Sequence, residues 1–332
     1  MKLDAYPLID AIERLIAKAD GDLEQTLEAE GFVAAGTAVE YVNAIEDAYS
    51  EAVGSYEDDL LKALQAATGV DNFISDIWPG IKDADDLEKA LKKIFKSQFD
   101  SMFRELTFNW VLGFNPDAAD AFTDDGRITK PAEYFIKSWS EDLAKLMRLN
   151  TNTIIEDVLL QAAEKGLSID ETADLIADRG IRSAGYRSRR VALTEVLRTE
   201  SYAELEGMRQ DPYTIKKVWK HTDAAIEPRE NHIAMDGQTA YVDEPFELVG
   251  ADGATYHPMC PRDTSLPAKE TVNCHCIMGR EKDDKILGMT LEELKAARLA
   301  AMDKVDADWA EKIDAVNAAR AAMYDEWGVY RG

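Results

Sequence analysis

Residues 188–221 read SRRVALTEVLRTESYAELEGMRQDPYTIKKVWKH, and the pattern of the chain changes within them. The first part is a helical pattern that runs to about Met208, whereas residues 215–221 show the partial alternation of a β-strand. Pro212 lies at the change, where its ring and its missing N–H cannot continue a helix. We therefore expect a mainly α protein of the α+β class, in which a small β-containing module follows a long helical part.

The placement of prolines extends this division to the whole chain. Six of the ten prolines lie between Pro212 and Pro267, so long helices fit before and after this stretch but hardly within it. The sequence predicts four parts: an acidic helical region at 1–130, a helical block at 131–211, a small α+β module at 212–280 and a C-terminal amphipathic helix at 281–332.

Local signals mark the ends of some elements. Apolar residues recur at helical spacing in much of the chain before residue 112 and again after residue 290. Ser168-Ile169-Asp170-Glu171 is a capping-box sequence and predicts a helix start, and we expect this helix to end near Gly180. Within the module, Asp236-Gly237 predicts a tight turn.

Composition excludes several classes of protein. The net charge of −26 repels the phosphate backbone of nucleic acids over most of the surface, so DNA contact is not electrostatically favoured. A hydrophobic content of 46% argues against a disordered chain. No stretch approaches the ~18 apolar residues that a membrane helix needs, and no apolar run follows Lys2. We therefore expect a protein that is neither secreted nor bound to a membrane.

All three cysteines and all four histidines lie within residues 221–276. In an extended segment Cys274 and Cys276 project to one side, while His275 projects to the other. Three thiolates and one imidazole make a full tetrahedral zinc set, so a structural zinc ion is the cofactor to consider. Its candidate ligands are Cys260, Cys274 and Cys276 with His257 or His232. Two other interpretations remain open, namely buried thiols without a metal and a disulfide.

Catalysis has less support in the sequence. An imidazole with a nearby charged group, as in His221 with Asp223 or His232 with Arg229, suits acid–base chemistry on a phosphodiester. The sequence contains no phosphate loop, no nucleophile elbow and no His-Glu-x-x-His motif. We expect no enzyme, and the alternative is a metal-dependent nuclease or related phosphodiesterase that uses His221, Asp223 and His232.

Four short motifs follow one another between about residues 180 and 280. They are Arg-Thr-Glu, Arg-x-x-His, Asp-Gly and Asn-Cys-x-Cys, represented here by Arg198, Glu200, Arg229, His232, Asp236, Gly237, Asn273, Cys274 and Cys276. In this order they resemble the Mu protein F-like family of tailed phages, also called head morphogenesis or minor head proteins. The chain departs from the family at His275, where arginine is usual. Some members carry Cys-x-x-Cys in place of Arg229-x-x-His232, which would put His232 near the Asn-Cys-x-Cys segment. His232 is therefore an alternative to His257 as the fourth zinc ligand.

The resemblance implies a structural minor head protein, present in few copies, that binds the portal inside the head and aids head morphogenesis or DNA ejection. The partners it implies are the portal protein and also the scaffold or major capsid protein. The implied location is the capsid interior of the virion, with the host cytoplasm as the place of assembly. The family implies no cofactor, so the zinc ion rests on the cysteine pattern alone. Because exposed apolar stripes favour being covered, we expect helix 85–112 or 291–327 to contact the portal.

Overall fold

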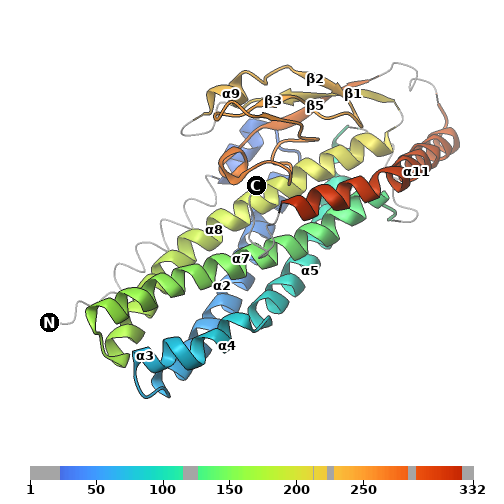
Figure 1. Cartoon of the computed structure of the whole chain (residues 1–332). Helices are drawn as coiled ribbons and strands as arrows, with labels where there is room; N and C mark the ends of the chain where they lie inside the picture. The colour runs from blue at the N-terminus through green and yellow to red at the C-terminus, as the bar shows by residue number, and fades with distance from the viewer. Residues whose placement is uncertain (1–22, 115–125, 212, 223–227, 283–288, 324–332) are drawn as a thin grey trace. The chain divides into compact units, whose positions relative to one another are not determined.

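The computed structural model describes residues 23–114, 126–211, 213–222, 228–282 and 289–323 (Figure 1). It is mainly helical with a few short antiparallel strands, which confirms the expected α+β class. The helical part consists of α2 (Ala35–Gln65), α3 (Val70–Asn72), η1 (Phe73–Ile77), α4 (Trp78–Asp83), α5 (Asp86–Phe114), α7 (Lys130–Lys165), α8 (Ile169–Gln210) and α11 (Leu291–Ala322). None of the helices in the described ranges is long and apolar enough to cross a membrane.

The chain divides into two compact units, each built from segments that are far apart in the sequence. Unit 1 comprises Met1–Val42, Phe103–Ile128 and Val196–Lys304, and unit 2 comprises Asn43–Met102, Thr129–Glu195 and Val305–Gly332. The division into four consecutive parts at residues 130, 211 and 280 groups the chain by its sequence pattern and stays a prediction.

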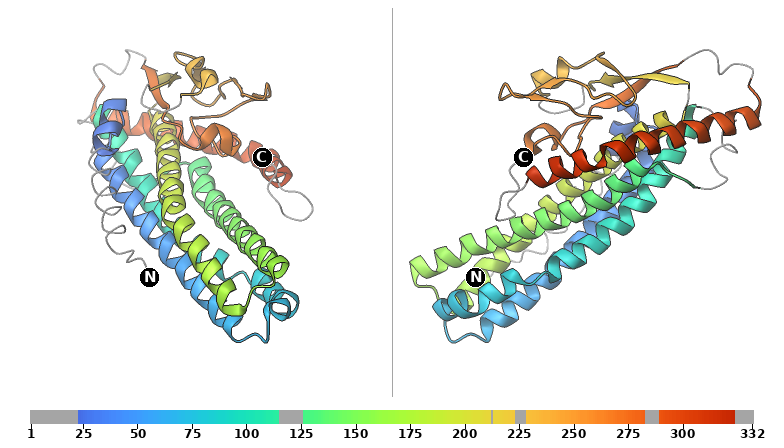
Figure 2. Two further views of the ribbon diagram at one scale, coloured as in Figure 1. Left: turned by 90° about the vertical axis from the view of Figure 1, so that its left-hand side faces the viewer. Right: turned by 45° about the vertical axis from the view of Figure 1, so that its right-hand side comes forward.

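Unit 2 is helical, and Figure 2 shows its portions of α2, α5, α7 and α8 running side by side. Its hydrophobic core joins residues of α2, η1, α4, α7 and α8, namely Leu60, Leu64, Phe73, Trp78, Ile155, Val158, Leu159 and Ile176. The predicted capping box is present, because Glu171 N donates to Ser168 Oγ and Ser168 N donates to Glu171 Oε2. The helix that starts there continues through Gly180 to Gln210, so the predicted end near Gly180 is wrong.

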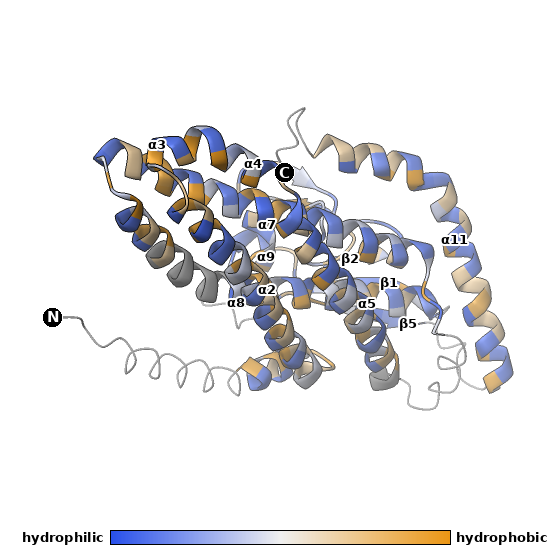
Figure 3. Ribbon diagram, turned by 90° about the horizontal axis from the view of Figure 1, so that it is seen from below, coloured by the Kyte–Doolittle hydropathy of each residue, from blue (hydrophilic) through white to orange (hydrophobic). Residues whose placement is uncertain are grey.

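The apolar stripe of α5 is buried within the protein itself. Leu91, Phe95, Phe99 and Phe103 are each 0% exposed. The stripe is therefore not the exposed apolar surface that the sequence led us to expect, whereas a contact of helix 85–112 with the portal stays a prediction. On α11, in contrast, Leu299 keeps 39% of its surface exposed. Figure 3 shows hydrophobic and hydrophilic residues interspersed along that helix.

The β-containing module belongs to unit 1. Its three-stranded antiparallel sheet has the order β2-β1-β5, and a second sheet pairs β3 with β4. The bounds of these elements are β1 (Thr214–Lys220), α9 (Glu230–Ile233), β2 (Thr239–Tyr241), β3 (Leu248–Val249), β4 (Thr255–Tyr256), α10 (Ala268–Thr271) and β5 (Ile277–Lys282). The predicted turn at Asp236-Gly237 is present, since Gly237 has a φ of 78° and its N–H donates to the carbonyl of Trp219.

The core of unit 1 joins this module to the last turns of α8 and to α5. Trp219 of β1 is 0% exposed and lies edge-on to the ring of Phe246, with centroids 5.3 Å apart. Leu205 and Met208 of α8 belong to the same buried cluster. The cluster also contains all three cysteines, so the region with the candidate ligands is packed directly beneath the sheet and against α8.

Candidate metal centre

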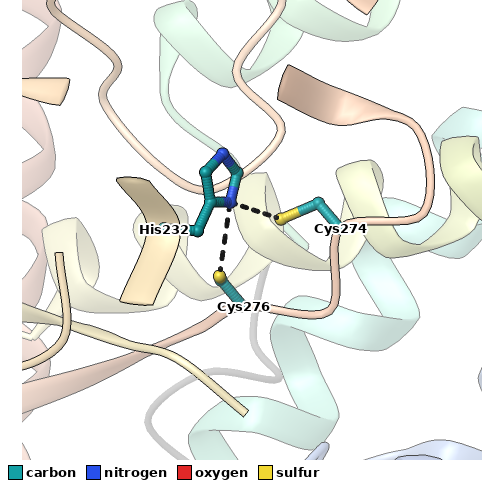
Figure 4. Close-up of side chains that lie close together, drawn as sticks. All are labelled: His232, Cys274 and Cys276. Carbon is teal, nitrogen blue, oxygen red and sulfur yellow. Dashed lines mark hydrogen bonds between the residues drawn. The ribbon is translucent and has the colours of Figure 1, made fainter. Parts of the chain in front are cut away.

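Three donor side chains from different segments of unit 1 meet at one point. His232 lies on α9, and Cys274 and Cys276 lie between α10 and β5. Their ligand atoms are all within 4.8 Å of one another. The Nδ1 atom of His232 lies 3.5 Å from the Sγ of Cys274 and 3.6 Å from the Sγ of Cys276, and Figure 4 shows the imidazole edge facing both sulfurs. Each of the three side chains is 2% exposed.

The backbone before β5 explains why the two sulfurs share a side. Asn273 has a φ of 56°, a left-handed conformation that asparagine adopts more readily than most residues. The chain then runs extended through Cys274 and Cys276, so the side chain between them projects away. His275 accordingly makes a hydrogen bond of 2.9 Å between its Nδ1 and Oε1 of Glu30. The expected alternation of this short segment is therefore present.

A buried carboxylate fixes the orientation of His232. Oε2 of Glu270 lies 3.0 Å from Nε2 of His232, so the proton belongs on Nε2 and the lone pair of Nδ1 faces the sulfurs. Asn231 Nδ2 and the backbone N–H of Ala251 also donate to Glu270. Although burial raises the pKa of Glu270, these hydrogen bonds and that of His232 lower it below its usual value overall. The carboxylate is therefore held ionised beside the imidazole.

The pKa values of the two thiols are shifted in opposite directions. The hydrogen bond from Cys276 lowers the pKa of Cys274 well below its usual value against the effect of burial, and the Arg262 charge acts in the same direction. The same hydrogen bond raises the pKa of Cys276, and burial adds to this effect. Cys274 is thus the thiol of the pair that ionises more readily. A thiolate is the form of cysteine that binds metals and attacks electrophiles.

A second histidine lies at the edge of this group. The Nδ1 atom of His221, directly after β1, is 3.7 Å from the Sγ of Cys276. Its Nε2 is buried and has no hydrogen-bond partner among the described residues. The backbone N–H of His221 donates to Oδ1 of Asp236, which holds the end of β1 against the turn after α9. His221 lies outside the set of three whose atoms are mutually within 4.8 Å.

The structure places the remaining predicted ligands elsewhere. Cys260 is 0% exposed, and burial together with the nearby Asp263 raises the pKa of its thiol. His257 is exposed on the segment after β4. Neither joins the group of His232, Cys274 and Cys276, which is the cluster of potential metal ligands within the described residues. Asp223, named for the alternative nuclease, lies outside those residues.

Two arginines of the family motifs make structural contacts to the backbone of the module. Arg198 of α8 donates from Nη1 to the carbonyl of Arg262 at 2.8 Å, and Arg229 donates from Nη2 to the carbonyl of Val272 at 2.6 Å. Glu200 is buried on the same helix, and burial and the neighbouring Glu204 raise its pKa well above the usual value. Arg198 thus joins the module to the end of α8, whereas Arg229 joins two segments within the module.

Arg262 is a central residue that sequence reasoning missed. It is 1% exposed and donates from Nη1 to the carbonyl of Cys274 at 2.7 Å and from Nη2 to Oγ of Ser201 at 2.6 Å. It thereby connects the cysteine segment with α8. Its φ of 61° is unusual for a residue with a long side chain, and no motif in the sequence marks it.

The arrangement suits metal binding better than acid–base catalysis. A general acid or base must reach a proton of the substrate, whereas His232 is 2% exposed and enclosed by Glu270 and the two sulfurs. Two thiol sulfurs and an imidazole nitrogen that converge within 4.8 Å offer soft ligands to a single ion.

Comparison with known proteins covers the same region. A family model described as Phage Mu protein F like protein matches residues 153–278, which contain the last part of α7, all of α8, the strands β1 to β4, the cysteine segment and the start of β5. A protein of Bacillus subtilis (strain 168), described as "Uncharacterized protein YqbB", is 35% identical over 239 residues. That similarity covers 68% of this chain and 75% of the relative. No solved structure shows a significant match to the chain.

Proposed function

Because the chain belongs to the family of phage Mu protein F-like proteins, we propose that it is a minor head protein of a tailed phage that binds the portal inside the head. In that position it aids head morphogenesis or DNA ejection. The observation that carries the proposal is the family match, which extends over the whole of α8 and the module that α8 supports.

The charge of the chain supports a place beside packaged DNA. With 64 acidic and 38 basic residues, the surface repels phosphate groups and does not adsorb to the genome. The contacts of Arg198 and Arg229 support a structural role as well, because these motif residues bind backbone carbonyls of the module.

We place the portal contact on α11. Its residues from 307 to 323 are mostly exposed, and Leu291 and Leu299 at its start are 36% and 39% exposed. The stripe of α5, in contrast, is already covered by the protein's own core. Apolar side chains on an exposed helix contribute most to association when they are buried against a partner.

The test mixes the purified full chain with the assembled portal of the same phage and follows co-migration by gradient sedimentation. We expect binding at low micromolar concentration and a loss of about tenfold or more in affinity for Leu299→Asp, because a charge would replace a buried apolar contact. Leu160→Asp is the matched control, since Leu160 is 58% exposed but lies on α7. Absence of co-migration with the assembled portal would contradict the proposed partner.

A further inference from the structure

We propose that the module holds one structural zinc ion, with His232, Cys274, Cys276 and His221 as its four ligands and Glu270 as the residue that orients His232. The site goes beyond the role in the phage head, since it concerns how the module itself is held together. It also differs from the ligand set that the sequence predicts, in which Cys260 and His257 take part.

The separations of the donor atoms fit a tetrahedral ion. Bonds of about 2.3 Å to sulfur and about 2.0 Å to nitrogen at tetrahedral angles place the two donors about 3.6 Å apart. The His232 Nδ1 atom lies 3.5 Å and 3.6 Å from the two sulfurs, and the His221 Nδ1 atom lies 3.7 Å from the Cys276 sulfur. The two distances from His232 therefore agree with edges of one coordination polyhedron, and the His221 distance agrees with an edge to Cys276 alone.

We assign His221 as the fourth ligand because its Nδ1 atom lies beside the Cys276 sulfur. Structural zinc sites take four protein ligands, and three donors alone would leave the ion open. His221 already contacts the Cys276 sulfur, and its Nε2 is buried without a hydrogen-bond partner among the described residues. Its side chain lies outside the group of three, so ligation requires it to move toward Cys274 and His232.

The surroundings match those of a metal ligand. In many zinc sites the non-coordinating nitrogen of a histidine donates to a carboxylate, which fixes the ring and its tautomer. Glu270 occupies that place at 3.0 Å from Nε2 of His232, and it is itself held by Asn231 and Ala251. A hydrogen-bonded, fully buried carboxylate behind a histidine that faces two sulfurs needs an explanation, and metal binding supplies one.

The choice of metal follows from the ligands. Two sulfurs and two imidazoles exclude magnesium and calcium, which prefer oxygen, and suit zinc. The ion would join the end of β1, the helix α9 and the segment before β5, which are separated in sequence by 11 and 42 residues (232 − 221 and 274 − 232). Because the strands of this module are short, a metal that binds only the folded site would stabilise it directly.

The first experiment needs no variant. The full chain is purified under reducing conditions without chelator, its zinc is counted by plasma mass spectrometry, and X-ray absorption at the zinc edge counts sulfur and nitrogen ligands. We expect one zinc per chain bound by two sulfurs and two nitrogens, and a lower melting temperature after chelation. A folded wild-type protein that holds less than about a tenth of an equivalent after reconstitution would overturn the proposal. A mass lower by two hydrogens, from a disulfide between Cys274 and Cys276, would overturn it too.

Variants then assign the ligands. Cys276→Ser should retain less than about a tenth of the zinc, whereas Cys260→Ser, the matched buried control, should retain all of it. Glu270→Gln should weaken binding about tenfold in competition with a chromogenic chelator. His221→Ala should replace one nitrogen ligand by an oxygen from water. An unchanged number of imidazole ligands in His221→Ala would remove His221 from the site, and full zinc in Cys276→Ser would refute the site as a whole.

Discussion

Gly207 allows α8 and α5 to approach each other within unit 1, and replacing it with alanine should destabilise the protein. A Cβ atom at this position would lie 2.3 Å from Cε3 and 2.8 Å from Cζ3 of Trp110. The indole has little freedom to retreat, because it is 3% exposed and the guanidinium of Arg280 lies 4.7 Å from its ring. One of the two helices must therefore shift, or the ring must leave its place.

The magnitude follows from two opposing effects. Alanine is favoured over glycine in a helix by about 1 kcal/mol, whereas overpacking a closed core costs about 1–3 kcal/mol. Contacts below 3.0 Å to a rigid ring cannot be relieved by moving a flexible side-chain end. We therefore expect the cost of overpacking to exceed the gain in helix propensity, with a net loss of about 1–2 kcal/mol in the free energy of unfolding. Guanidinium unfolding, followed by circular dichroism, measures this difference.

The same substitution in α2 is the matched control. Gly54 also lies inside a long helix, but a Cβ atom there would meet nothing within 4 Å. Gly54→Ala should therefore stabilise the protein by about 0.5–1 kcal/mol. A Gly207→Ala variant that is as stable as the wild type, beside a stabilised Gly54→Ala, would refute the inferred close contact between Gly207 and Trp110.

Three further predictions concern unit 1. Arg262→Ala should lower the free energy of unfolding by about 3 kcal/mol in urea titration, because the carbonyl of Cys274 loses a buried charged donor; an unchanged midpoint would contradict this role. Burial raises the pKa of Glu204 to about 8 from 4.5, so its contribution to stability is complete below about pH 4.5 and is lost as the pH rises through about 8. Glu204→Gln should flatten this decline in a series of urea midpoints, and an unaltered decline would assign it to other groups. The protein should show no DNA cleavage with magnesium, manganese or zinc, whereas cleavage that disappears in a stable His232→Ala variant would favour the nuclease.

Much of the fold could be predicted because its signals are local. The capping box at Ser168–Glu171 starts α8, and Asp236-Gly237 forms a turn, since each depends on hydrogen bonds between residues close in sequence. The expected break near Gly180 was wrong, because one glycine costs only about 1 kcal/mol in a helix interior, and favourable packing along a long helix outweighs that cost. The apolar spacing of α5 predicted its helix, but whether that stripe meets the core or a partner depends on the other helices.

The sequence by itself determined that the soft metal ligands all lie within residues 221–276, and that Cys274 and Cys276 share a side when extended. It could not choose among the histidines or exclude Cys260, because the path from His232 to Cys274 passes through several turns and short strands whose directions no spacing rule predicts. Only the tertiary structure turned Cys260 into the core beside Asp263 and brought His232, Glu270 and the cysteine pair together. The physical reason is that spacing along one element sets which side chains share a face, whereas contacts between elements arise from packing of the whole unit.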